Sequence, residues 1–120
     1  MLNEYTRTYK AEGKGVNRLD VSIAYALGGI NYFTYKNEPR GYYFSIQPWE
    51  SDGVWRKFTA FSGVKMCALP CNRQSKKRYE EAKGMIDDLA AEYLAEFCEK
   101  NGIELLGNEY TENERERKVH

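Results

Sequence analysis

The first 70 residues alternate between strand-forming runs and turn signals, and this pattern constrains the fold more than any other feature of the sequence. Runs rich in β-branched and aromatic residues cover 4–11, 18–27, 31–36, 42–47, 54–61 and 64–69. The segments between them are short and contain Gly, Pro, Asn or Asp, residues that accept the backbone conformations of tight turns. Because loops this short join antiparallel neighbours, the pattern predicts an antiparallel meander of about five to six strands.

The clearest alternation of apolar and polar residues lies in the run 18–27. One face of this run is apolar and consists of Leu19, Val21, Ile23, Tyr25 and Leu27. Successive side chains of a strand point to opposite faces, so we expect this face to pack in the core. A two-residue turn at 28–29 would then place Tyr32 and Thr34 on the core face, and Phe33 and Tyr35 on the opposite one.

Residues 75–101 have the periodicity of an amphipathic helix. Its apolar stripe recurs at intervals of three and four residues and consists of Tyr79, Ala82, Ile86, Leu89, Tyr93 and Phe97. Ser75 is a candidate N-cap, and Gly102 is a candidate stop signal. We therefore expect one long C-terminal α-helix packed on the sheet.

The expected architecture is a single α+β domain over residues 1–106, with strands in 3–70 and the helix in 75–101. A chain of 120 residues is long enough to bury one core without metal or disulfide staples. Residues 107–120 are almost wholly polar and cannot offset their ordering entropy by burial, so the sequence predicts a mobile tail there. The sequence has no apolar run of the roughly 20 residues that cross a bilayer and no leader-like N-terminus. We therefore expect a cytoplasmic protein with no membrane contact.

The sequence offers little for catalysis. The only histidine is His120, which argues against imidazole-based triads and most metal sites. Cys67 and Cys71 lie about 13 Å apart if their segment is a strand, too far to share a metal or a bond. The glycine-rich segments 13–16 and 27–31 connect strands, whereas a phosphate loop opens onto a helix. We expect a protein that is not an enzyme and has no catalytic residues, metal or cofactor.

The zero net charge of the chain conceals two oppositely charged halves. Residues 1–78 contain 13 Lys and Arg against 6 Asp and Glu, whereas residues 79–120 contain 5 against 12. In the basic half, cations alternate with aromatic residues, a combination that holds single-stranded nucleic acid by phosphate pairing and base stacking. The candidate nucleic-acid-binding residues are Arg7, Lys10, Lys36, Arg40, Arg56, Lys57, Lys76, Lys77, Arg78, Tyr35, Tyr43 and Trp55.

A structural interpretation of the same residues remains open. Aromatic residues are good strand formers and fill sheet cores, and Lys and Arg protect edge strands from aggregation. Only the patch 76–78 runs against this interpretation, because cations at a helix N-terminus oppose the helix dipole. An exposed edge strand would also allow two copies to pair as a homodimer.

Two segments, GKGVNRLDVSIAYALGGINYFTYKNEPRGYYFSIQPWE and FTAFSGVK, resemble a group of small accessory proteins of mobile elements. These proteins are carried on plasmids, prophages and conjugative elements of intestinal Gram-positive bacteria. The resemblance covers about half of the chain and rests on NYFTYK, EPRGYY and FTAFSG. It implies a mobile-element gene, a setting in which small charge-segregated proteins are often inhibitors of host defence, including anti-CRISPR proteins.

Two functions follow as hypotheses. The first is a non-enzymatic binding protein of a mobile element that binds nucleic acid through a basic, aromatic sheet face. The alternative is a protein inhibitor of a host defence nuclease, which would use exposed aromatic residues and the acidic helix face as a mimic of DNA. The candidate partner-binding residues for this alternative are Asp88, Glu92 and Glu96.

Overall fold

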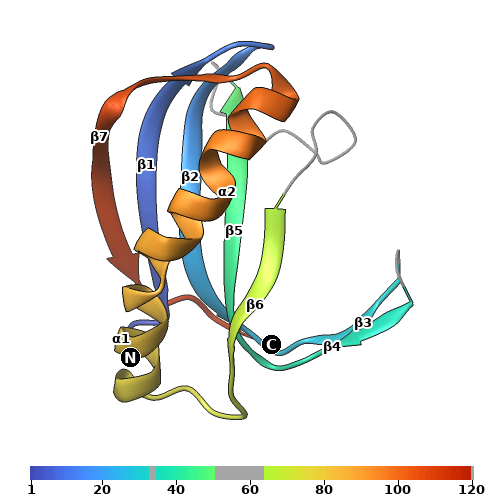
Figure 1. Cartoon of the computed structure of the whole chain (residues 1–120). Coiled ribbons are helices and arrows are strands. Elements are labelled where there is room, and N and C mark those ends of the chain that lie inside the picture. The colour runs from blue at the N-terminus through green and yellow to red at the C-terminus, as the bar shows by residue number, and fades with distance from the viewer. Residues whose placement is uncertain (33–34, 51–63, 120) are drawn as a thin grey trace.

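The chain folds into a twisted antiparallel sheet with two helices on one face, as a computed structural model of residues 1–32, 35–50 and 64–119 describes it (Figure 1). The elements follow in the order β1 (Glu4–Glu12), β2 (Val16–Ala26), β3 (Gly29–Asn31), β4 (Lys36–Glu38), β5 (Gly41–Glu50), β6 (Val64–Pro70), α1 (Lys76–Gly84), α2 (Ile86–Asn101) and β7 (Glu104–Arg115). The predicted α+β class with an antiparallel sheet is confirmed. No helix in the described ranges is long and apolar enough to cross a bilayer.

The main sheet has five strands in the order β6-β5-β2-β1-β7. Its first four strands in sequence form the predicted meander, in which β1 pairs with β2, β2 with β5 and β5 with β6. The chain then crosses the sheet through α1 and α2 and returns to the opposite edge, where β7 pairs antiparallel with β1. The first and last strands of the fold are therefore neighbours.

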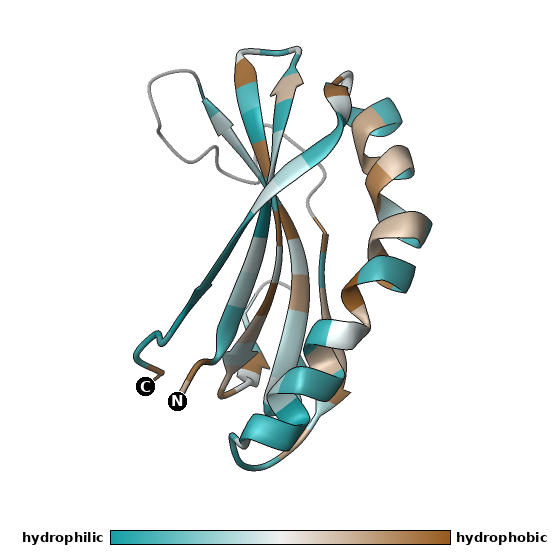
Figure 2. Cartoon of the chain, turned by 90° about the vertical axis from the view of Figure 1, so that its left-hand side faces the viewer, coloured by the Kyte–Doolittle hydropathy of each residue, from teal (hydrophilic) through white to brown (hydrophobic). Residues whose placement is uncertain are grey.

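The core lies between the helices and one face of the sheet, and the predicted alternation of β2 is confirmed. Leu19, Val21 and Ile23 have no exposed surface, and Tyr25 is almost as deeply buried. The helices contribute Tyr79, Ala82, Ile86, Leu94 and Phe97 to the same cluster. Full burial of one such aliphatic side chain stabilises a fold by about 1.5 to 3 kcal/mol. In Figure 2 the brown, apolar segments of the helices face the sheet.

The prediction of one long C-terminal helix is wrong, because the helix breaks at Met85 and a strand follows it. Ser75 caps α1 as predicted, since its hydroxyl accepts a hydrogen bond from the Arg78 N–H at 3.1 Å. At the break, the Met85 N–H donates to the Ala82 carbonyl at 3.0 Å, a tighter turn than the α-helical one. Gly84 directly precedes it, and glycine inside a helix costs roughly 1 kcal/mol relative to alanine.

The prediction of a mobile tail over 107–120 is also wrong, because most of this segment belongs to β7. Its residues are largely exposed, so burial of apolar surface does not explain the strand. Instead, Glu4 pairs with Arg115 and Tyr9 with Tyr110 in the ladder with β1, and the two tyrosine rings lie 5.2 Å apart. The polar sequence gives no local sign of this partner.

The segment between β2 and β5 forms a separate two-stranded ribbon, which we call the arm. Gly29 pairs with Glu38 in the arm, so the predicted hairpin turn at 28–29 is wrong. Tyr32 is 80% exposed and does not lie on the predicted core face, whereas Tyr35 is exposed as expected. The arm projects away from the main sheet in Figure 1. Phe33, Thr34 and the predicted strand 54–61 lie outside the described residues.

Candidate functional site

Exposed cations from three segments gather at one end of the molecule, which we call the basic end. This end lies at the bottom of Figure 1, where the β4–β5 connection, the start of α1 and the C-terminal segment approach one another. Its exposed cationic residues are Arg40, Arg73, Lys76, Lys77, Arg78, Arg115, Arg117 and Lys118. Because Arg115 lies 37 or more positions along the chain from the cations of the other two segments, only the tertiary fold brings these charges together.

Asn3 fastens two of the three segments. Its side-chain amide donates to the Gln74 Oε1 at 2.9 Å and to the Arg117 carbonyl at 2.8 Å, and its Oδ1 accepts from the Arg117 N–H at 2.8 Å. Asn3 is only 2% exposed, so these bonds are shielded from water. The third segment is tied in by the Cys71 N–H, which donates to the Arg40 carbonyl at 2.9 Å.

Some charges of the basic end are paired and others are free. The Glu4 carboxylate lies 2.9 Å from the Arg115 Nε and 3.5 Å from the Arg117 Nη1. Arg78 pairs with Glu81 at 2.8 Å. The remaining cations of this end have no ion pair among the residues that the structure describes: Arg40, Arg73, Lys76, Lys77 and Lys118. The end therefore has excess positive charge, which favours an anionic partner.

The face of the sheet opposite the helices, here called the outer face, is polar and bears a shallow depression. The central strands contribute small side chains, Ser22, Ala24, Ala26 and Ser45, to this depression of about 200 Å³. Longer side chains from the flanking strands surround it, with Lys65 on β6 at one side and Arg115 and Arg117 at the other. The depression therefore opens onto the basic end.

Aromatic rings on the outer face are covered by cations. The Arg18 guanidinium lies 4.2 Å from the centroid of the Trp49 ring, and the Lys65 ammonium lies 5.6 Å from that of Tyr43. Tyr43 itself is 6% exposed, and its hydroxyl donates to the Pro39 carbonyl. Burial, with the nearby Cys67 and Glu38, raises the pKa of Tyr43 to about 12. The rings of Trp49 and Tyr43 therefore already contact cations of the protein itself.

No family model matches the chain, and neither the curated proteins nor the solved structures contain a match.

The structure unites some of the predicted nucleic-acid-binding residues and separates others. Arg40 directly precedes β5, whereas Lys76, Lys77 and Arg78 begin α1, so these four belong to two of the segments that form the basic end. Lys36 and Tyr35 lie on the arm, both exposed. Arg56, Lys57 and Trp55 lie outside the described residues.

Arg7 does not lie on a cationic rim as the sequence suggested. It is 9% exposed, its Nη1 pairs with the Asp87 Oδ1 at 2.7 Å, and its guanidinium lies 4.6 Å from the Tyr110 ring centroid. Burial alone would lower the Arg7 pKa, but the hydrogen bonds that the guanidinium donates to the Tyr5 hydroxyl and the Asp87 carboxylate outweigh it, so the pKa is raised. The alternation Tyr5, Arg7, Tyr9 was a signal that Arg7 shares the helix-facing side of β1.

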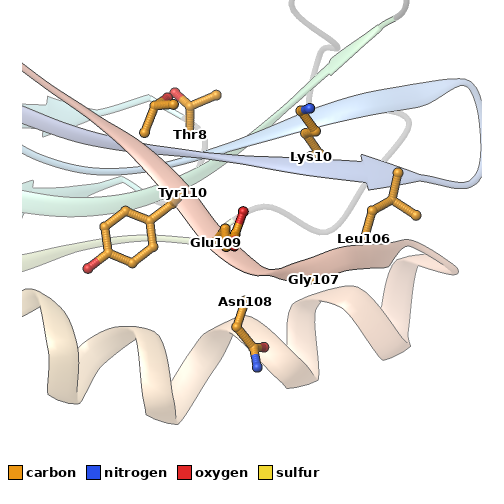
Figure 3. Close-up of a pocket in the computed structure, with 8 residues that line it drawn as sticks. Thr8, Lys10, Leu106, Gly107, Asn108, Glu109 and Tyr110 are labelled. Atoms are coloured by element: carbon orange, nitrogen blue, oxygen red, sulfur yellow. The ribbon is translucent and has the colours of Figure 1, made fainter.

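Lys10 lies far from the basic end, beside an irregular stretch between β1 and β7. Ala11 pairs with Leu105 but Tyr9 pairs with Tyr110, so four residues of β7 lie opposite Lys10 alone. This bulge lines an open depression of about 660 Å³ (Figure 3). In Figure 3 Tyr110 and Asn108 point toward the helices, whereas Lys10 and Leu106 point away from them.

The candidate partner-binding residues form a row on α2. Asp88, Glu92 and Glu96 are all exposed and recur every fourth residue, so they lie on one side of the helix. The core residues Leu94 and Phe97 occupy the opposite side. The three predicted acidic side chains are therefore exposed on one side of α2.

The carboxylate of Glu114 joins β7 to α1. The Glu114 Oε1 accepts from the Tyr79 hydroxyl at 2.9 Å and lies 2.6 Å from the Lys83 Nζ. The hydrogen bond from Lys83, and then that from Tyr79, lowers the Glu114 pKa below its usual value. Burial and the Glu114 carboxylate raise the pKa of Tyr79. These bonds hold the edge strand against the helix.

The described residues contain no group of His, Cys, Asp and Glu side chains arranged to hold a metal ion. Cys67, Cys71 and Cys98 are free thiols, and burial raises the pKa of each. A raised thiol pKa leaves little of the nucleophilic thiolate near neutral pH. The surface features suited to a function are therefore the basic end, the outer face and the acidic row.

Proposed function

We propose that the protein binds nucleic acid through its basic end and outer face, and that it does so without catalysing a reaction. The observation that carries this proposal is the convergence of cations from three separate segments, fastened by the buried Asn3. A lysine or arginine that pairs with a phosphate releases condensed counterions, which supplies most of the affinity of such surfaces. Three of the free cations lie close together in the sequence and are exposed to solvent: Arg73, Lys76 and Lys77.

The acidic residues of α2 lie away from the basic end, which supports binding of nucleic acid at that end. Asp88, Glu92 and Glu96 project from α2, whereas the basic end lies at the start of α1. A charge separation of this kind orients the molecule in the field of a polyanion and accelerates productive encounters. The cations at the start of α1 also oppose the helix dipole, so their placement has a stability cost that binding would offset.

The proposal is tested by fluorescence anisotropy with a labelled single strand of about 25 nucleotides at roughly 50 mM salt, and by repeating the titration at rising salt. The variant combines Lys76→Ala and Lys77→Ala. We expect weaker binding, and a slope of log K against log[salt] that is shallower by up to about two, roughly one for each phosphate contact removed. Lys100→Ala, at an exposed cation of α2, is the matched control and should leave the slope unchanged.

Two results would contradict the proposal. Absence of binding by the unaltered protein to any strand at low salt would eliminate it. Equal salt slopes for the double variant and the Lys100 control would show that the basic end does not contact phosphates.

A second function is favoured by the acidic row on α2. Asp88, Glu92 and Glu96 rise about 6 Å per step along the helix, so they present negative charge along a line. Such a line could occupy a basic channel of a host defence nuclease, in keeping with the resemblance to accessory proteins of mobile elements. Reversal of the three residues to Lys should then abolish inhibition of DNA cleavage, while Leu94 and Phe97 keep the core intact. Unchanged cleavage by every nuclease of the host at a large molar excess of the protein would refute this alternative.

A further inference from the structure

We infer that the depression on the outer face is a subsite for one backbone phosphate and its attached sugar, with Arg115 and Arg117 binding the phosphate. This inference rests on the proposed nucleic-acid function and specifies how the strand is held. The depression is about 200 Å³, which is small for a ligand pocket and suits a backbone unit rather than a base pair.

Glu4 positions the two arginines. The Arg115 Nε donates to the Glu4 Oε1 at 2.9 Å, and the other Glu4 oxygen lies 3.5 Å from the Arg117 Nη1. Glu4 is 8% exposed and its Oε2 is buried without a hydrogen-bond partner in the described part of the chain. One buried carboxylate therefore keeps two cationic groups close together that would otherwise repel each other.

The Arg115 guanidinium leaves the edge formed by its two terminal nitrogens available to a phosphate. Glu4 accepts from the Nε, neither terminal nitrogen of Arg115 donates a hydrogen bond to another described residue, and the side chain is 58% exposed. A guanidinium oriented in this way can donate two parallel hydrogen bonds to a phosphate. Lysine cannot reproduce this geometry, because its ammonium is a point charge.

The floor of the depression explains why a backbone unit can reach these arginines. Ser22, Ala24 and Ser45 have short side chains at positions where the flanking strands carry long ones. The Ser22 hydroxyl is hydrogen-bonded to that of Thr6 at 2.9 Å, which fixes one polar group in the floor. A sugar can lie against this surface with its phosphate at the arginine side and Lys65 at the other, and none of these contacts reads a base.

The test uses ¹⁵N-labelled protein titrated with two probes, an oligothymidylate and inorganic phosphate. We expect both probes to shift the amide signals of Ser22, Ala24 and Ser45 and the Nε signal of Arg115. Arg115→Lys retains the positive charge but removes the guanidinium that can donate two parallel hydrogen bonds. Affinity for the oligothymidylate should therefore fall about tenfold, with an unchanged slope of log K against log[salt]. Lys118→Ala removes an exposed cation of the same segment, so it should make the slope of log K against log[salt] shallower. The shifts that the probes cause in the signals of Ser22, Ala24 and Ser45 should be the same as in the unaltered protein.

Glu4→Gln guards against a loss caused by misfolding. The amide oxygen of Gln still accepts from the Arg115 Nε, while the negative charge below the phosphate disappears, so affinity should be equal or higher. The subsite would be overturned if the oligothymidylate bound without shifting the floor signals and if Arg115→Lys left its affinity unchanged. The proposed function would remain intact in that case, provided that the Lys76 and Lys77 double variant still weakened binding. A response to phosphate alone, without binding of any strand, would overturn both.

Discussion

Replacement of Asn3 by alanine is the sharpest test of how the basic end is assembled. The side chain makes three hydrogen bonds, two to Arg117 and one to Gln74, and it is 2% exposed. Each hydrogen bond contributes about 0.5 to 1.5 kcal/mol net, so Asn3→Ala should lower the free energy of unfolding by about 2 to 4 kcal/mol. For a chain of this length that corresponds to a fall in Tm of roughly 10 °C.

The measurement is urea denaturation followed by circular dichroism, with two comparison variants. Asn3→Asp keeps the volume and the acceptor for the Arg117 N–H but loses both donors, so it should also destabilise the fold. Asn72→Ala changes an exposed asparagine of the neighbouring loop and should alter stability by less than about 0.5 kcal/mol. A loss below about 0.5 kcal/mol for Asn3→Ala, or a fully stable Asn3→Asp, would refute the role of these hydrogen bonds.

Four further predictions address the rest of the fold. Truncation after Gly107 removes most of β7 and should lower the Tm by more than about 10 °C or prevent folding; an unchanged melting curve would show that the strand is dispensable. Phe97→Ala should cost about 3 to 5 kcal/mol because the side chain is buried in the core, and a cost below about 1 kcal/mol would place it at the surface. The lowered Glu114 pKa means that the stability gained from Lys83 is fully present above about pH 4.5 and is lost as the pH falls through the folded-state pKa. Glu114→Gln should flatten this acid dependence, and an identical pH profile would contradict it. Tyr35→Ser should weaken binding of single strands without changing stability, since the ring is 84% exposed; unchanged affinity would leave the arm without a role in stacking.

The sheet was predictable where burial alternates along one strand. In β2, Leu19, Val21 and Ile23 have no exposed surface, and their spacing in the sequence indicated the core face directly. The wrong prediction at 28–29 has a different origin, because a glycine pair signals a turn but not its partner strand. Gly28 enters the arm with a φ of 72°, and a Cβ there would lie 2.4 Å from the Glu38 carbonyl.

The edge strand β7 could not be predicted from local composition. Its glutamates are satisfied by distant groups, as when Tyr5 donates to Glu112 at 2.9 Å and Tyr79 donates to Glu114 at 2.9 Å. The residues of β7 are almost all exposed, so this strand has no periodic apolar signal of its own. A polar segment therefore resembled a disordered tail.

The candidate site was predictable only in part for a related reason. The cations at 76–78 stand together in the sequence and were singled out, whereas Arg115 and Arg117 lie in the acidic half of the chain. Their return to the basic end depends on the pairing of β7 with β1. Charge counted along the sequence cannot reveal an arrangement that the crossing helices create.

The pairing of the first strand with the last also determines how the protein is made. Glu4 and Arg115 contact each other across 111 positions, so β1 leaves the ribosome long before its outer partner exists. Throughout that interval one edge of β1 presents unpaired backbone groups, which can pair with strands of other chains. Contacts between such distant residues also form slowly. Chains stalled before residue 104 should therefore aggregate, and the complete sheet can form only after synthesis of the C-terminal strand.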